Sequence, residues 1–176
     1  MQTRHLTLVV LLALAACVAP PPPPAPKTVS APPPVVAAPA PLPRLTGDWI
    51  DWPFTPGNWT YSRDGRGSVG QFGAPGRNPN VSLRCDAQNR RVTLAREVSA
   101  PGQRIVIRTS STMKELAAKP MGGTPAYLAA DIATTDPILD AMAFSRGRIL
   151  VEAEGQEPLI LPSWAEITRI VEDCRG

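Results

Sequence analysis

The sequence predicts an α+β fold, mainly an antiparallel β-sandwich or open barrel with two short helices, the second of them C-terminal. Two observations lead to this prediction. Between residues 58 and 108, short segments with alternating apolar and polar residues recur and are separated by turn residues. Beyond residue 136, apolar residues instead follow each other at spacings of three and four, which is typical of helices. The part from residue 45 to residue 176 has about 130 residues, enough for one core and one domain.

The strand prediction depends on alternation. Val81, Leu83 and Cys85 alternate with polar residues, so one face of this strand is expected to point into the core. Turn residues at 86–89 and at Pro101-Gly102 separate it from two further segments. We therefore expect a three-stranded antiparallel meander from residue 81 to residue 108. Other expected strand features are Trp59 and Tyr61 at strand spacing, a hairpin turn at Asp64-Gly65, and strands at Ser68–Phe72, Leu116–Ala118 and Ala126–Ala129.

Capping residues mark both predicted helices. Asp136 is a typical N-cap and proline suits the first helical position, so a helix is expected from Pro137 to Arg146. Segments at 148–153 and 159–161 flank a glycine and are expected to form a hairpin. Ser163 and Glu166 have capping-box spacing and predict the start of the second helix. One face of that helix is expected to carry Trp164, Ile167, Val171 and Cys174 into the core.

The N-terminal residues have the pattern of a signal peptide, which we place at residues 1–16. Arg4 and His5 form a short polar region, an apolar run follows, and small residues stand where cleavage is expected. The apolar run has roughly 11 residues, well short of the ~20 that cross a bilayer as a helix. The alternative is an ordinary secretory leader followed by a chance cysteine.

The four residues Leu14-Ala15-Ala16-Cys17 resemble the bacterial lipobox. This resemblance implies cleavage before Cys17 and lipidation of that cysteine, so that acyl chains would hold the mature chain on a membrane. An aspartate after the cysteine is the inner-membrane retention signal in enteric bacteria, and Val18 stands there instead. We therefore expect a protein of the bacterial cell envelope, lipid-anchored in the outer membrane and facing the periplasm.

Residues 17–44 are expected to form the lipidated cysteine and a linker, because the stretch consists almost entirely of Pro, Ala and Val. Such a composition favours extended polyproline II, and about 25 residues at ~3.1 Å each would span up to ~75 Å. The alternatives are a ligand for a proline-recognising domain or a segment that threads the peptidoglycan mesh. The globular domain is expected at residues 45–176.

The sequence has three cysteines, and assigning Cys17 to a lipid leaves Cys85 and Cys174. Because exported compartments are oxidising, these two are expected to form a disulfide. Both also lie on predicted inward faces. Two buried free thiols are the alternative.

Two sets of residues could form a binding surface. A net charge of +3 is too small to indicate nucleic acid. Arginines in the predicted meander could form a basic stripe that meets phosphates of lipid headgroups, lipopolysaccharide or acidic polymers, or they could be a solvated face balanced by acids. These are Arg84, Arg91, Arg96, Arg104 and Arg108. The tryptophans of the N-terminal part could stack on carbohydrate or fill the core, and these are Trp49, Trp52 and Trp59.

Catalytic patterns are weak. The single histidine, His5, lies in the leader, which excludes a Ser-His-Asp triad, a Cys-His pair and a histidine-built zinc site in a mature chain. Residues 111–114 match S-x-x-K but lack the companion motifs, and residues 65–70 match G-x-G-x-x-G without a following helix. Asp131, Asp136 and Asp140 could supply a glycosidase pair, although capping and solvation explain them better. No enzyme activity, metal or cofactor is expected.

The order of elements is similar to that of small exported β-sandwich proteins of alphaproteobacteria, including invasion-associated locus B-like proteins and accessory lipoproteins of type VI secretion. The resemblance is carried by Leu83-Arg84-Cys85, by the segment 139–148 and by the segment 164–174. It implies a non-catalytic envelope protein that presents a binding or structural module, with envelope proteins or cell-wall and lipid phosphates as partners. A small cell-wall-acting hydrolase is the alternative function.

Overall fold

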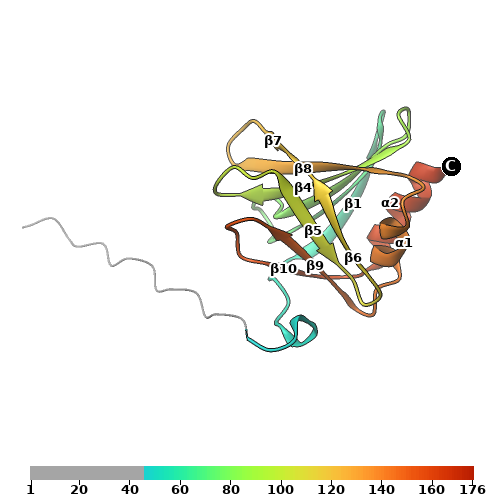
Figure 1. Ribbon diagram of the computed structural model, residues 1–176. Coiled ribbons are helices and arrows are strands. Elements are labelled where there is room, and N and C mark those ends of the chain that lie inside the picture. The colour runs from blue at the N-terminus through green and yellow to red at the C-terminus, as the bar shows by residue number, and fades with distance from the viewer. Residues whose placement is uncertain (1–45) are drawn as a thin grey trace, which may run out of the picture. The chain divides into compact units, whose positions relative to one another are not determined.

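The computed structural model describes residues 46–176, so the expectations for the signal peptide, Cys17 and the linker lie outside the described residues. The described chain forms two antiparallel sheets and two helices, the second of them C-terminal (Figure 1). The predicted fold class is therefore confirmed, and of its two forms the sandwich is the one observed.

The larger sheet has six strands in the order β1-β2-β3-β4-β8-β7. Its first four strands follow one another as antiparallel neighbours, and the predicted turn at Asp64-Gly65 joins the first two. Glycines 65, 67 and 70 therefore belong to a hairpin and its second strand, not to a phosphate-binding loop. The strands are β1 (Asn58–Asp64), β2 (Gly67–Gly73), β3 (Val81–Asp86), β4 (Arg91–Val98), β7 (Lys119–Met121) and β8 (Ala126–Ala133).

The smaller sheet has four strands in the order β10-β9-β5-β6. They are β5 (Arg104–Arg108), β6 (Met113–Ala117), β9 (Arg148–Ala153) and β10 (Leu159–Pro162), and the last two form the predicted hairpin. The expected meander from residue 81 to residue 108 is wrong in its third strand. The second edge of β4 is occupied along its whole length by β8, so the Pro101-Gly102 segment crosses to the other sheet, where β5 pairs with β6 and β9.

Helix α1 (Pro137–Ala143) and helix α2 (Ala165–Arg175) differ from the prediction at one end each. Asp136 is the N-cap of α1 as expected, and its Oδ1 accepts a hydrogen bond from the Ile138 amide at 3.0 Å. α1 ends at Ala143 instead of Arg146. The predicted capping box of α2 is wrong, because Trp164 is the N-cap and the Ser163 hydroxyl donates to the Met142 carbonyl oxygen at 2.8 Å.

Helix α2 packs against β2 and β3 on the inner face of the larger sheet, with α1 beside it at one end of the sandwich (Figure 1). Gly70 on β2 allows this close approach, because a Cβ atom there would lie 3.4 Å from Cγ1 of Ile170. The helix buries Ile167, Ile170, Val171 and Cys174.

The core fills the space between the two sheets and beneath the helices. It consists of alternate residues of each strand, those that point inward, which is the pattern expected of a sandwich. Its largest members include Phe72, Leu83, Leu94, Ile105, Ile107, Leu128, Ile132, Ile138, Leu139, Met142 and Ile149.

Residues 46–57 precede β1 and include the short 3-10 helix η1 (Trp49–Asp51). We call this segment the N-terminal strap. Leu150 and Ile160 pair on the outer face of the smaller sheet, yet each is only 1% exposed. The Thr55 amide donates to the Ile160 carbonyl oxygen, and the Ile160 amide donates to Thr55 Oγ1, both at 2.9 Å. The strap is therefore bonded to β10 and covers this apolar part of the outer face.

Candidate binding surfaces

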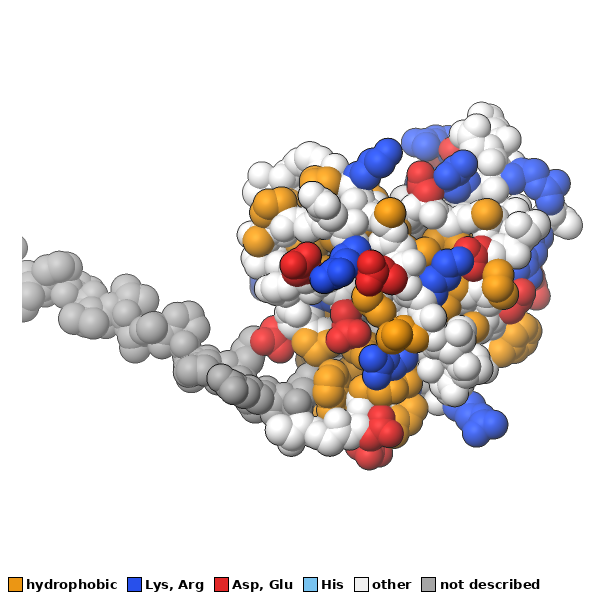
Figure 2. Space-filling model, in the orientation of Figure 1, with side chains coloured by type: hydrophobic (Ala, Val, Ile, Leu, Met, Phe, Trp, Pro, Cys, Tyr) orange, Lys and Arg blue, Asp and Glu red, His pale blue; other side chains and the backbone are white. Residues whose placement is uncertain are grey.

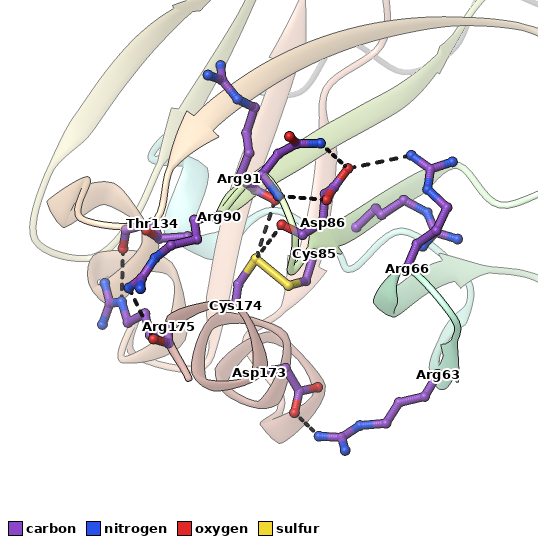
Figure 3. Close-up of a disulfide and its surroundings, with 12 residues drawn as sticks. Arg63, Arg66, Cys85, Asp86, Arg90, Arg91, Thr134, Asp173, Cys174 and Arg175 are labelled. Atoms are coloured by element: carbon purple, nitrogen blue, oxygen red, sulfur yellow. Dashed lines mark hydrogen bonds and ion pairs between the residues drawn. A yellow bond between two sulfur atoms is a disulfide. The ribbon is translucent and has the colours of Figure 1, made fainter.

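A disulfide joins β3 to α2, two elements that are far apart in the sequence (Figure 3). Cys85 on β3 and Cys174 on α2 have Cα atoms 5.3 Å apart, within the usual range for a disulfide, and both residues are buried. The Cys174 sulfur contacts the Arg91 carbonyl oxygen at 3.3 Å. The predicted pairing of these two cysteines is therefore present in the structure.

Two arginines near the disulfide, Arg63 and Arg66, are paired with carboxylates, whereas Arg90 donates to the Arg175 carbonyl oxygen at 3.2 Å (Figure 3). Arg63 forms an ion pair with Asp173 of α2, and the Tyr61 hydroxyl donates to the same carboxylate at 2.6 Å. Burial would raise the pKa of Asp173, but the hydrogen bonds from Tyr61 and Arg63 outweigh it and keep that pKa below the ordinary carboxyl value. The ion pair of Arg66 and Asp86, at 3.6 Å, lies on the other side of the disulfide.

Two of the predicted stripe residues lie on the outer face of the larger sheet. Arg84 on β3 pairs with Asp64, and Arg91 on β4 lies 3.6 Å from Asp131. Each of these two arginines is already paired with a carboxylate, so the outer face of the larger sheet is charge-balanced there, which agrees with the solvated alternative. Basic and acidic side chains are interspersed in the same way on the face of the domain that Figure 2 shows.

The expectation that Arg96 belongs to an exposed face is wrong. Arg96 is 2% exposed and points inward with the alternate residues of β4, because it shares their side of the strand. Its Nη1 donates to the Val151 carbonyl oxygen at 2.6 Å and its Nη2 donates to the Glu157 carbonyl oxygen. Burial lowers the pKa of Arg96 to about 10, against the opposing effect of Glu152 and Glu157, so it stays cationic at neutral pH. Arg96 therefore clamps one sheet to the other.

The last two stripe residues lie on the other sheet, because β5 is part of it. Arg104 is flanked by Glu115 at 3.8 Å and Glu154 at 3.9 Å, beside a hollow of about 330 Å³. Arg108 has its Nη2 3.5 Å from the Met113 sulfur. The five predicted arginines are thus divided between two outer faces and the core, and they do not form a single stripe. The hollow is lined by Arg104, Val106, Glu115, Glu152, Ala153 and Glu154.

The three predicted tryptophans are also divided. Trp59 is 5% exposed, packs edge-on against Phe72 with ring centroids 5.4 Å apart, and donates from Nε1 to the Pro162 carbonyl oxygen at 2.9 Å. For Trp59 the core interpretation is correct and the surface interpretation is wrong. Trp49 and Trp52 are half-buried in the N-terminal strap, where Trp52 Nε1 donates to the Thr46 carbonyl oxygen at 3.2 Å.

Exposed aromatic side chains that the sequence did not place on the surface lie where α1 ends and α2 begins. Phe144 is 76% exposed and Trp164 is 44% exposed. Their loops are joined by Ser163, whose hydroxyl donates to the Met142 carbonyl oxygen and whose amide donates to the Gly147 carbonyl oxygen at 3.2 Å. Trp164 was expected in the core, but as an N-cap it precedes the helix and does not follow helical spacing. That boundary position is the sequence signal that could have placed it.

Phe54 and Met113 extend this surface from neighbouring segments. The Arg148 guanidinium lies 4.4 Å from the Phe54 ring centroid. The turn before Met113 is bonded to the loop after α1, since the Arg146 amide donates to Ser110 Oγ at 2.9 Å. Figure 1 shows the β5–β6 turn, the α1–β9 loop and the β10–α2 loop at the same end of the sandwich. We call the exposed side chains of Phe54, Met113, Phe144 and Trp164 the apolar rim.

Arginines beside the apolar rim differ from Arg63 and Arg66, which are paired with carboxylates. Within residues 46–176, none of Arg108, Arg146 and Arg148 forms an ion pair with a carboxylate. Arg146 is exposed, and Arg148 donates from Nη1 to the Trp52 carbonyl oxygen at 2.7 Å. The rim therefore combines apolar rings with arginines that form no ion pair in the described part of the chain, and Asp51 and Glu166 on the same segments form none there either.

The candidate catalytic residues have separate partners. Lys114 of the S-x-x-K segment pairs with Asp136, Asp131 pairs with Arg91, and Asp140 accepts two hydrogen bonds from Arg175, at 2.6 and 3.0 Å. A hollow of about 360 Å³ adjoins Lys114. Its lining consists of Ser111, Thr112, Met113, Lys114, Asp136, Pro137, Ile138 and Ala141. Each of the three carboxylates is paired with a different basic residue, whereas a glycosidase uses two carboxyl groups that face each other across the substrate.

Two further findings concern the part of the chain that the structure describes. No group of three or more His, Cys, Asp or Glu side chains there is arranged to hold a metal ion. None of its helices combines the length and the apolar character needed to span a membrane.

The fold and these surfaces define a disulfide-bonded β-sandwich domain with an aromatic and basic surface at one end. Comparison of the chain with protein-family models, with curated proteins and with solved structures finds no match.

Proposed function

We propose that the chain is a lipoprotein of the bacterial cell envelope, lipidated on Cys17, that presents a non-catalytic binding or structural domain on a proline-rich stalk. Its location would be the outer membrane, facing the periplasm. Its partners would be the membrane through Cys17 and, through the domain, envelope proteins or phosphates of lipid and cell wall.

The observation that carries this proposal is the buried Cys85–Cys174 disulfide. Disulfides persist in oxidising compartments such as the bacterial periplasm and are rare in the cytosol. The pair also accounts for two of the three cysteines and leaves Cys17, which stands at the end of the lipobox-like segment. Both features favour export, and they do so independently of each other.

The non-catalytic part of the proposal is supported by the engagement of the candidate acids. Asp136 both caps α1 and pairs with Lys114, and Asp140 is held by Arg175. Carboxylates held by these contacts contribute to the structure of the domain. A general acid or base must instead be able to transfer a proton to or from a bound substrate.

Lipidation is tested by expressing the full chain in a Gram-negative host and labelling with an alkyne-bearing fatty acid. We expect the label and membrane fractionation for the natural chain, and loss of both in Cys17→Ser. Val18→Ser is the matched control, because it changes the neighbouring position and keeps the sulfur. Equal labelling of Cys17→Ser and the natural chain would disprove the anchor.

The non-catalytic assignment is tested by incubating the unlipidated Cys17→Ser chain with purified peptidoglycan. We expect no sustained release of soluble fragments. Turnover that continues with time and is abolished by Asp136→Asn or Ser111→Ala would establish the hydrolase instead.

A further inference from the structure

The apolar rim consists of four large hydrophobic side chains that remain exposed. With Phe144 76%, Met113 58%, Phe54 45% and Trp164 44% exposed, these four side chains present roughly 400 Å² of apolar surface. The largest apolar patch on a monomer is of about this size and is often functional. The patch is built from loops held together by Ser163 and Ser110, so its shape is fixed by the fold.

The charge around the rim indicates the chemistry of what covers it. Arg108, Arg146 and Arg148 form no ion pair within residues 46–176, and Arg77, Arg90 and Arg169 on other parts of the domain form none either. What distinguishes the rim is that its arginines lie close to exposed apolar side chains. Arginine is suited to phosphate because its guanidinium offers several donors in one plane. Aromatic rings flanked by arginine are the combination found where proteins meet the headgroup region of a bilayer.

The form of the rim indicates a flat occupant. Met113 lines the hollow at Lys114, whereas Phe144 and Trp164 line neither that hollow nor the one at Arg104. A small ligand normally occupies a concave site that buries most of its surface. Exposed rings that lie outside a hollow instead suit insertion into an extended, soft surface.

Under the proposed function, the length of the linker keeps the domain within reach of lipid. The strap begins at Thr46, reaches Phe54 within the same short segment, and is held at the rim by the bond from Arg148 to Trp52. The 28 or so residues from Cys17 to Arg44 would confine the domain to within about 75 to 90 Å of the anchor. Such a tether raises the effective concentration of the membrane at the domain to about the millimolar range.

We propose that the apolar rim is a bilayer-contacting surface, in which Phe144 and Trp164 insert at the headgroup level while Arg146 and Arg148 meet lipid phosphates. This inference deepens the proposed function and rests on it, because the anchor is what keeps lipid within reach. Lipid attachment by this chain then has two parts, the acyl chains on Cys17 and the end of the folded domain.

The test uses the mature chain, residues 17–176, with Cys17→Ser, so that no acyl chain contributes. Flotation with phosphatidylglycerol vesicles and with phosphatidylcholine vesicles measures the partition coefficient. We expect binding to phosphatidylglycerol, a blue shift of tryptophan emission, and about a tenfold loss of partitioning in Phe144→Ser, the amount expected for one inserted ring. Trp164→Phe should keep most of the binding and lose the blue shift.

Two control variants separate the rim from general stickiness. Met121→Ser removes an exposed apolar side chain on β7, and it should leave partitioning unchanged. Arg146→Ser should reduce the preference for phosphatidylglycerol over phosphatidylcholine. Circular dichroism of each variant verifies that the fold is intact.

Three outcomes would overturn the inference: absence of vesicle binding by the folded unlipidated chain, equal binding by Phe144→Ser, or a blue shift that persists in Trp164→Phe. Crosslinking from position 144 to a protein, without vesicle binding, would assign the rim to a protein partner and also overturn it. Fatty-acid labelling of Cys17 is read separately, so a failed vesicle experiment with a labelled Cys17 would leave the anchor proposal standing.

Discussion

Removing the disulfide is expected to take away much of the domain's stability. Cys85 and Cys174 are 89 residues apart along the chain. In the chain-entropy model, a cross-link over a loop of that length contributes about 4.6 kcal/mol at 25 °C by restricting the unfolded chain. Because domains of this kind have free energies of unfolding of about 5–15 kcal/mol, a loss of that size is a large part of the total.

A second contribution comes from packing at the two sulfur atoms. Cys85 is 0% exposed and Cys174 is 3% exposed, so replacing both by alanine removes buried atoms next to β3 and α2. We expect roughly 1 kcal/mol for each site from lost contacts and the small cavities left behind. The double variant should therefore lose about 5 to 7 kcal/mol in all.

Urea unfolding of the unlipidated chain measures this effect. The Cys85→Ala/Cys174→Ala variant is compared with the parent chain, oxidised and in the presence of a reductant. The reduced parent should lose the entropic part and keep the packing part, so its free energy of unfolding should lie between the other two. A difference of less than about 2 kcal/mol between the oxidised parent and the variant would refute the loop-closure reasoning.

Two further predictions concern polar groups inside the fold. Arg96→Ala should lower the free energy of unfolding by about 2 to 4 kcal/mol in urea titrations, because it leaves the Val151 and Glu157 carbonyl oxygens without their donor; an unchanged midpoint would show that water replaces the guanidinium. Burial alone would raise the pKa of Asp136, but the hydrogen bonds from Lys114 and from the Ile138 amide hold that pKa below the ordinary value of about 3.9. The ionised carboxylate therefore stabilises the fold at higher pH, and this stabilisation is lost as the pH falls through the folded-state pKa. Asp136→Asn, which preserves the cap, should flatten the pH dependence of unfolding below about pH 4, and an unaltered acid limb would contradict this.

Local patterns in the sequence predicted much of the fold. Alternation at Val81, Leu83 and Cys85 placed β3 correctly, and the Asp136 N-cap located the start of α1. The same patterns could not choose the neighbour of β5, because pairing depends on which distant strand occupies the edge of β4. Alternation fixes which face a residue occupies and leaves its partner strand open.

The candidate surface was harder to predict than the fold. Arg96 occupies the same side of β4 as Val92 and Leu94, so alternation places it inward, while its charge suggested the surface. Trp164 lies one residue before α2 begins, so the helical spacing that predicts inward residues does not hold for it. The apolar rim joins loops that are far apart in sequence, and no single segment carries its pattern.

The N-terminal strap determines where mechanical load would enter the domain. A pull transmitted along the chain toward Thr46 acts first on the bonds from Thr55 to Ile160 and from Arg148 to Trp52. These contacts attach the strap to β10 and β9 of the smaller sheet, whereas the disulfide joins α2 to the larger sheet. If the proposed stalk is under tension, the strap should therefore separate and expose Leu150 and Ile160 before the load reaches the disulfide-linked core.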